Sequence, residues 1–506
     1  MPALDTQTKV AVIGAGAMGA GIAQVAAQAG HHVFLHDQRE GAAEAGRAGI
    51  AKVLQRRVDK GKMDQQDLDA LLDRIQPVAD LSEVAESGLV IEAIVENLDI
   101  KRGLLADLEA LCREDAILAT NTSSISVTSL GAGMKHPGRL VGMHFFNPAP
   151  LMALVEVVLG LATDKAVAET VYDTAANWGK KPVYATSTPG FIVNRVARPF
   201  YAESLRLVQE QAADPATLDA LIREAGNFRM GAFELTDLIG HDVNYAVTNS
   251  VFNAYYQDTR FLPSLVQQEL VSAGRLGRKS GQGFYSYQEG AERPEPQTEA
   301  PRQSNESVVI VEGSLGPASA LVDRLRDAGL KIIERAGNGQ LRFGQAVLAL
   351  TDGRMATERA AEEGCANLVL FDLAFDYAQA SRLAIATADQ ASGQAIDDAC
   401  ALLQKAGLEV SRIADRPGLV IMRTVAMLAN EGADAHLHGV ATVDDIDLAM
   451  KAGLNYPEGP LSWSDRLGAG RTFTVLTNIQ NSYGEDRYRP SLLLRKNCFA
   501  NKGFYA

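Results

Sequence analysis

The chain has 506 residues, of which 47% are hydrophobic and only 6% aromatic, a balance typical of α/β and helical proteins rather than β-sandwiches. This length predicts about three or four domains. The formal net charge of −14 argues against sequence-independent binding of nucleic acid phosphates.

The cysteines and the apolar runs indicate the compartment. The four cysteines are far apart and form no CxxC pair, which argues against a disulfide framework or a zinc site; they are Cys112, Cys365, Cys400 and Cys498. No signal-peptide pattern opens the chain, and no apolar run reaches about 18 residues. We expect a cytoplasmic protein with no membrane anchor and no bound metal.

The stretch from Lys9 to Asp37 reads as strand, glycine turn, helix and strand. Glycines at GxGxxG spacing allow a tight turn, close approach of backbone amides to a pyrophosphate, and tight packing of helix on strand; they are Gly14, Gly16 and Gly19. Asp37 closes the second strand, where its carboxylate can accept hydrogen bonds from the adenine ribose. We predict an NAD site, because Asp37 would repel a 2′-phosphate; nearby Arg39 is the one feature that favours NADP.

Polar residues follow three further predicted strands, at 88–96, 116–120 and 139–143. They are Asn97 and Lys101 after the first, Asn121, Thr122, Ser123 and Ser124 after the second, and His144 to Pro148 after the third. Ligands of open parallel sheets bind beyond the carboxyl ends of the strands, so we expect these residues to share one site.

Glu156 interrupts the apolar run 151–159. A charged residue in such a setting costs several kcal/mol unless it is paired. His144 is the nearest suitable partner, and a carboxylate would orient its ring, fix its tautomer and raise its affinity for a proton. The alternative is that Glu156 lies on an exposed strand face.

Changes in pattern along the chain predict the domains. The α/β rhythm ends near residue 187, a helical pattern follows, and a polar segment containing prolines precedes a weaker α/β rhythm that lacks the glycine fingerprint. We predict a Rossmann-type, doubly wound NAD-binding domain at 1–187, a helical substrate or dimer-type domain at 188–287, a linker at 288–306, a reduced Rossmann-like domain at 307–414 and a second helical domain at 415–506.

The second helical segment repeats the first at an offset of 228 residues. The matches include Pro189-Gly190 with Pro417-Gly418, Arg195 with Arg423, Glu203 with Glu431, Asp219 with Asp447, Asn227 with Asn455 and Asp237 with Asp465. One pairing fails, because Asn194 corresponds to Met422. A buried asparagine needs hydrogen-bond partners, and a substrate oxygen is a plausible partner only in the first copy. We expect one active site, in the N-terminal half.

These motifs resemble those of the L-3-hydroxyacyl-CoA dehydrogenase family. The resemblance covers residues 9–290 and includes the glycine turn with Asp37, Glu92 to Glu96 with Lys101, Asn121 to Ser124, His144 to Pro148, Glu156, and Thr188 to Arg195. The whole chain resembles the long single-function form, which includes 3-hydroxybutyryl-CoA and 3-hydroxyadipyl-CoA dehydrogenases.

The resemblance implies that His144 is the general base, that Glu156 holds it, and that Ser123 and Asn194 bind the substrate oxygen. It implies NAD contacts at Gly14, Gly16, Met18, Gly19, Asp37, Ile94, Val95, Glu96, Lys101, Ser123 and Asn147. Lys60 matches a lysine that contacts CoA, although Val53 stands where some relatives carry a polar contact. A solvated helix face is the commoner explanation of the basic segment around Lys60, which consists of Lys52, Arg56, Arg57, Lys60 and Lys62.

The implied reaction is the NAD-dependent oxidation of an L-3-hydroxyacyl-CoA in β-oxidation-like fatty acid metabolism or phenylacetate catabolism. The implied assembly is a monomer with an internal pseudo-dimer, or a homodimer, with no nucleic acid or membrane partner. Two alternatives remain: a lysine-dependent 3-hydroxyacid dehydrogenase that needs no CoA, and an NAD-binding structural protein such as a lens crystallin. The acyl chain length stays open.

Overall fold

The computed structural model describes residues 3–505. The chain forms two compact units, one of Met1–Arg195 with His438–Leu454 and the other of Val196–Leu437 with Asn455–Ala506. A short segment of the second sequence repeat therefore belongs to the same unit as the glycine turn.

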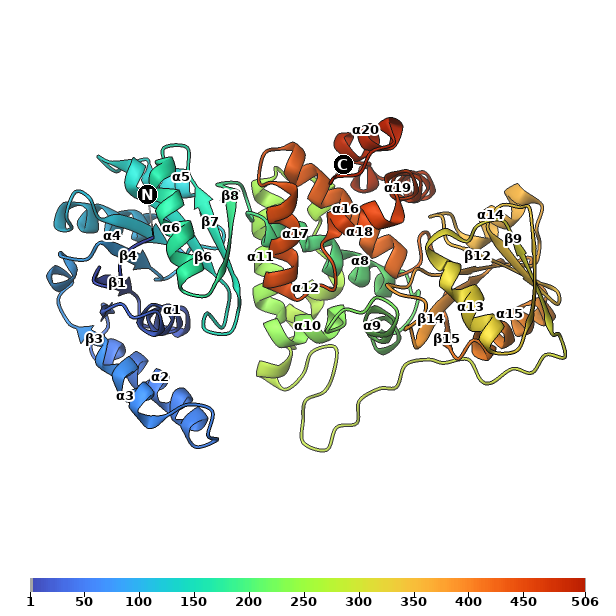
Figure 1. Ribbon diagram of the computed structural model, residues 1–506, viewed down its shortest axis with the longest axis horizontal. Helices are drawn as coiled ribbons and strands as arrows, with labels where there is room; N and C mark the ends of the chain where they lie inside the picture. The colour runs from blue at the N-terminus through green and yellow to red at the C-terminus, as the bar shows by residue number, and fades with distance from the viewer. Residues whose placement is uncertain (1–2, 506) are drawn as a thin grey trace. The chain divides into compact units, whose positions relative to one another are not determined.

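The first unit is built on an eight-stranded sheet in the order β3-β2-β1-β4-β5-β6-β7-β8 (Figure 1). All neighbouring strands are parallel except β6 and β7. The central four-residue strands are buried throughout, as expected for parallel strands covered on both faces. The strands are β1 (Val10–Ile13), β2 (Val33–His36), β3 (Ile75–Val78), β4 (Leu89–Glu92), β5 (Ile117–Thr120), β6 (Leu140–Phe145), β7 (Leu154–Leu159) and β8 (Lys181–Thr186).

The helices of this unit include one from the second sequence repeat. They are α1 (Ala17–Gln28), α2 (Ala42–Val58), α3 (Gln65–Asp73), α4 (Leu98–Leu111), α5 (Val127–Gly131), α6 (Lys165–Asn177), α7 (Val193–Val196) and α17 (Val443–Leu454). Helix α17 packs against β7 and β8. Gly453 permits this packing, since a β-carbon there would lie 2.6 Å from Leu154 Cδ2. The helix thus covers strands at the edge of the sheet, where open backbone groups would otherwise invite unwanted pairing.

The second unit combines helices from both repeats. Those of the first copy are α8 (Arg198–Gln209), α9 (Pro215–Glu224), α10 (Ala232–Ile239), α11 (His241–Ala254) and α12 (Leu265–Ser272); those of the second are α16 (Ile421–Leu437), α18 (Pro460–Leu467), α19 (Ala469–Tyr483) and α20 (Leu492–Ala500). Helices α8 and α16 pack directly against each other. Buried Arg423 on α16 donates to Glu203 on α8 at 2.7 Å. The two copies therefore share one core.

The backbone confirms the repeat inferred from the sequence. Two non-glycine pairs at the offset of 228 both adopt positive φ: Phe191 (47°) with Leu419 (53°), and Asn227 (56°) with Asn455 (55°). The helical pattern that follows residue 190 is divided by a turn at Ala197, which separates α7 from α8, with Pro199 in the first turn of α8. Proline suits that position because its missing N–H is not needed there.

A second sheet, also in the second unit, has the order β10-β9-β11-β12-β13-β14-β15 and mixes parallel with antiparallel pairs. Its strands are β9 (Val308–Glu312), β10 (Lys331–Arg335), β11 (Gln340–Phe343), β12 (Ala346–Leu350), β13 (Leu368–Phe371), β14 (Arg382–Thr387) and β15 (Glu409–Arg412), with helices α13 (Ser319–Asp327), α14 (Ala356–Glu363) and α15 (Gly393–Lys405). The predicted fold class is confirmed: a Rossmann-type sheet, a reduced sheet domain and two related sets of helices.

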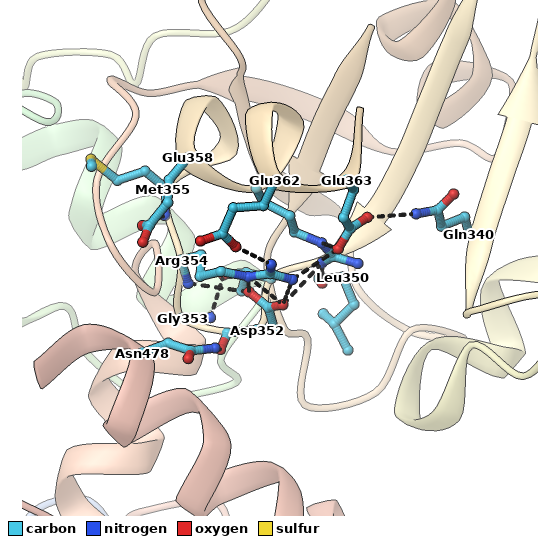
Figure 2. Close-up of polar contacts among 12 residues, drawn as sticks. Gln340, Leu350, Asp352, Gly353, Arg354, Met355, Glu358, Glu362, Glu363 and Asn478 are labelled. Carbon is cyan, nitrogen blue, oxygen red and sulfur yellow. Dashed lines mark hydrogen bonds and ion pairs between the residues drawn. The ribbon is translucent and has the colours of Figure 1, made fainter. Parts of the chain in front are cut away.

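A network of ion pairs connects the loop between β12 and α14 to the end of α14. Figure 2 shows Arg354 between Asp352 and the carboxylates of Glu362 and Glu363, which lie 2.5 to 2.8 Å from its guanidinium nitrogens. Asn478 on α19 donates to the backbone oxygen of Asp352 at 2.9 Å. This contact joins the reduced sheet domain to the second set of helices.

Candidate active site

The glycine turn between β1 and α1 leaves the start of α1 open. Gly14 has φ +105°, and a β-carbon there would lie 2.6 Å from the Ala93 carbonyl oxygen. Gly16 is the N-cap of α1, has no side-chain cap, and faces no atom within 4 Å of where a β-carbon would be. The first amides of a helix have no partner within the helix, and here no side chain blocks their approach to an anion. This cradle fits a dinucleotide pyrophosphate.

Asp37, just beyond the end of β2, is tied to the same turn. Its carboxylate accepts hydrogen bonds from Ala15 N at 2.8 Å and from Arg39 N and Nε at 3.0 Å. The bond from Arg39 is the main reason that the pKa of Asp37 falls to about 2. Asp37 is thus held ionised beside the glycine turn, as a ribose-binding acid must be, and Arg39 is engaged with it.

The chain after β4 differs from the prediction. The strand ends at Glu92 instead of continuing to Glu96, and Glu92 forms a buried ion pair with Lys101. Lys101 is 1% exposed and also lies 3.3 Å from Glu96 Oε2. The sequence carries a signal for this pair, since Glu92 interrupts an apolar run as Glu156 does.

Glu96 organises the loop after β5. Its Oε1 accepts hydrogen bonds from Thr122 Oγ1 at 2.6 Å, from Ser123 N at 3.1 Å, and from both N and Oγ of Ser124 at 3.1 and 2.9 Å. Burial by itself would raise the pKa of Glu96, but the Thr122 hydroxyl and the charge of Lys101 hold that pKa below its usual value. A charged acceptor therefore fixes the backbone on which Ser123 sits.

His144 and Glu156 are directly opposite each other on the antiparallel strands β6 and β7. Nδ1 of His144 lies 2.6 Å from Oε2 of Glu156, and both side chains are buried. The predicted contact is confirmed. A carboxylate facing Nδ1 favours the tautomer with hydrogen on Nδ1, which leaves Nε2 as a proton acceptor. Phe146 and Phe191 pack on the ring, with centroids 4.5 and 5.8 Å from that of His144.

The other oxygen of Glu156 holds the start of α7. Oε1 accepts hydrogen bonds from Ile192 N at 2.9 Å and Val193 N at 3.0 Å. The carboxylate thus does two things: it orients His144 and it caps the helix that carries Asn194.

The second copy keeps only the capping half of this arrangement. Asp372, which follows β13, accepts hydrogen bonds from Val420 N and Ile421 N at 2.9 and 2.7 Å, and these two residues correspond to Ile192 and Val193 in the repeat. No histidine faces Asp372 among the contacts of residues 3–505. Burial raises the pKa of Asp372 to about 6.

Asn194 and Ser123 meet beside this pair, as Asn194 Nδ2 donates to the Ser123 carbonyl oxygen at 3.4 Å. Asn121 Oδ1 accepts from Phe145 N at 2.8 Å, which joins the end of β5 to the strand that carries His144. The glycine turn, the Ser123 loop and His144 thus all lie at the carboxyl ends of the parallel strands β1, β5 and β6 of one sheet.

The remaining predicted residues are less closely connected. Met18 is half-buried on α1, Val95 is 61% exposed in the loop after β4, and Asn147 is exposed after β6. Lys60 lies exposed in the turn after α2, away from any contact with the other candidate residues in the described chain. Neither Lys60 nor the basic segment around it is drawn into the polar network of the site.

The fold and the site define a Rossmann-type dinucleotide-binding protein in which a histidine pairs with a buried carboxylate. Residues 9–188 match the model of the 3-hydroxyacyl-CoA dehydrogenase NAD binding domain, and residues 190–287 and 418–503 match that of the C-terminal domain of the same enzymes. Residues 348–417 match the 3-hydroxybutyryl-CoA dehydrogenase reduced Rossmann-fold domain. The chain belongs to the 3-hydroxyacyl-CoA dehydrogenase family and is an NAD-dependent oxidoreductase.

Full-length and shorter relatives agree with this assignment. The chain is 44% identical over 501 residues to 3-hydroxyadipyl-CoA dehydrogenase of Escherichia coli, covering 99% of both proteins. It resembles the crystal structure of 3-hydroxybutyryl-CoA dehydrogenase from Escherichia coli K12 with a TM-score of 0.88 and 45% identity, over 98% of this chain and 99% of the other. A (S)-3-hydroxybutyryl-CoA dehydrogenase from Ralstonia eutropha matches 56% of this chain over its whole length, with 36% identity and a TM-score of 0.54.

No helix within residues 3–505 combines the length and apolar character needed to cross a bilayer. The same residues contain no cluster of three or more side chains suited to holding a metal ion.

Proposed function

We propose that His144 is the general base in the oxidation of an L-3-hydroxyacyl-CoA to the 3-ketoacyl-CoA. Nε2 of His144 takes the proton of the 3-hydroxyl group as the C3 hydride leaves. Bound NAD supplies the acceptor for that hydride. The observation that carries the proposal is the buried contact of 2.6 Å between His144 and Glu156 at the carboxyl edge of the sheet.

The other residues act on charge and position. Glu156 stabilises the imidazolium that forms, and it keeps the ring in the tautomer that accepts the proton at Nε2. The Asn194 amide and the Ser123 hydroxyl donate hydrogen bonds to the substrate oxygen and stabilise the charge that develops there. Asp37 binds the adenine ribose, the glycine turn binds the pyrophosphate, and the residues from Ile94 to Glu96, with Met18 and Asn147, shape the remainder of the NAD site.

We propose short 3-hydroxyacyl-CoA thioesters, linear or carrying a terminal carboxylate, as the substrates. This proposal is supported by the similar proteins, which are named as dehydrogenases of 3-hydroxybutyryl-CoA or 3-hydroxyadipyl-CoA. The corresponding pathways are β-oxidation-like fatty acid metabolism or phenylacetate catabolism in the cytoplasm. In this proposal Lys60 contacts the CoA part of the substrate.

A kcat/KM series tests the substrate assignment. It compares 3-hydroxybutyryl-, 3-hydroxyhexanoyl-, longer and 3-hydroxyadipyl-CoA with free 3-hydroxybutyrate. We expect turnover of the thioesters and none of the free acid. Equal turnover of the free acid would favour a 3-hydroxyacid dehydrogenase that needs no CoA, and no turnover of any thioester would favour an NAD-binding structural protein.

We further propose that the second helical copy takes the place of a dimer partner within a single chain. We also propose that the domain boundaries lie at residues 187, 287, 306 and 414. The packing of α16 on α8 and the buried pair of Arg423 with Glu203 support the first proposal. A chain that ends at residue 299 should lose stability or form dimers through the uncovered face of α8. A truncated chain that stays monomeric, soluble and as stable as the full chain would contradict the proposal.

A further inference from the structure

A cavity of about 410 Å³ lies within the second unit, and none of the residues assigned to catalysis is among those that line it. Helices α8 and α11, the segment 259–267 and the short helix η6 (Asp486–Tyr488) form its walls. Its volume falls within the range of about 300–1,000 Å³ that is usual for small-molecule sites.

Arg198 is the unusual residue of this cavity. Its side chain is buried, with the residue only 5% exposed, yet no carboxylate lies within ion-pair distance of it in the described chain. Its one hydrogen bond runs from Nη1 to Thr248 Oγ1 at 3.0 Å, and Nε has no partner. The guanidinium also packs on the ring of Tyr201, 5.0 Å from the centroid. A buried charge without a counter-ion is expensive, which makes Arg198 a site for an anion.

The other charges that face the cavity are already neutralised. Arg206 pairs with Glu210 and Glu485. Arg487 pairs with Glu203, and Asp486 pairs with Arg489. These ion pairs leave Arg198 as the one uncompensated cation among the described residues that line the cavity.

The internal repeat shows that the fold does not require this arginine. Arg198 corresponds to Ala426 at the offset of 228, and α16 forms a buried helix with alanine at that position. The first copy thus holds an arginine that its structural counterpart lacks, just as it holds Asn194 where the second copy has Met422.

The rest of the wall suits an organic molecule with a polar end. Leu205, Phe261, Leu262 and Pro263 provide apolar surface, and Ser264 Oγ is a second buried polar atom without a partner. We propose that this cavity binds a short aliphatic carboxylate whose carboxyl group pairs with Arg198. The guanidinium of an arginine can donate two parallel hydrogen bonds to the two oxygens of a carboxylate, and the apolar wall accommodates the carbon chain.

Binding of adipate and of hexanoate to the full chain, measured by titration calorimetry, tests the proposal. Both acids should bind the wild type, and Arg198→Ala should weaken both by at least about tenfold, the usual effect of losing a hydrogen-bonded ion pair. Arg495→Ala, which removes an exposed arginine of α20, is the matched control and should bind both acids normally. Failure of the wild type to bind either acid, or equal binding by Arg198→Ala, would overturn the proposal. Tighter binding of inorganic phosphate than of adipate would contradict a carboxylate occupant.

The carboxylate can come from the substrate or from a free acid, and kinetics separate the two sources. If Arg198→Ala lowers kcat/KM for 3-hydroxyadipyl-CoA but not for 3-hydroxyhexanoyl-CoA, the occupant is the terminal carboxylate of the substrate. If the ratio of kcat/KM for 3-hydroxyadipyl-CoA to kcat/KM for 3-hydroxyhexanoyl-CoA is unchanged while adipate binding is lost, the occupant is a free acid. Activity on 3-hydroxybutyryl-CoA should persist in the variant, so that failure of this proposal is distinguishable from failure of the assignment of His144.

Discussion

The substitution Glu156→Gln removes the charge beside His144 and keeps the shape of the side chain. With charge centres about 4 Å apart and an effective dielectric constant of about 20, the carboxylate stabilises an imidazolium by about 4 kcal/mol. Each 1.36 kcal/mol corresponds to a factor of ten in rate, so kcat should fall by about 1,000-fold. The amide oxygen can still accept from Ile192 N and Val193 N, which leaves its NH₂ group facing Nδ1 and favours the tautomer with hydrogen on Nε2.

The assay is single-turnover formation of NADH from 3-hydroxybutyryl-CoA, with the affinity for NAD measured in parallel. We expect the rate of hydride transfer to fall and NAD binding to stay within about twofold, because Glu156 does not belong to the cradle between β1 and α1. Asp372→Asn is the matched control, since Asp372 caps a helix in the same way without a histidine. A rate for Glu156→Gln within about tenfold of the wild type would refute the electrostatic reasoning.

Three further predictions concern the cofactor, pH and stability. Asp37→Ser should raise the kcat/KM ratio of NADP over NAD by about 100-fold, because the ionised acceptor beside the glycine turn is lost; an unchanged ratio would contradict the role of Asp37. Burial raises the pKa of Asp372 from 3.8 to about 6, so its contribution to stability is present below about pH 4 and lost as the pH rises through 6. Urea unfolding at a series of pH values should show the wild type losing about 3 kcal/mol relative to Asp372→Asn between pH 4 and 7, and parallel curves would exclude this titration. Arg423→Met leaves Glu203 without one of its two arginines and should lower the free energy of unfolding by about 3–5 kcal/mol. An unfolding midpoint in urea equal to that of the wild type would contradict this prediction.

Local signals in the sequence were enough to predict the central contact. A single carboxylate in an apolar run requires a partner if it is buried, and the histidine at the end of the preceding strand was the nearest one of suitable chemistry. The glycine turn was equally readable, because the spacing of its glycines reflects backbone constraints that act within a few residues.

Contacts between distant segments were not predictable in the same way. Glu96 reaches the backbone of Ser123 across 27 positions, and nothing in either segment specifies that distance. The capping role of Asp372 was not predictable either, because at the constant offset of 228 the residue that corresponds to Glu156 is Ala384. The reduced sheet domain is shorter, and its capping carboxylate therefore comes from a different position along the chain.

The central claim is that His144 removes the proton of the 3-hydroxyl group, and the rate of hydride transfer in His144→Gln tests it most directly. We predict a decrease of about 100- to 10,000-fold, the usual contribution of a general base, with NAD affinity within about twofold of the wild type. A variant that reduces NAD at close to the wild-type rate would contradict the claim.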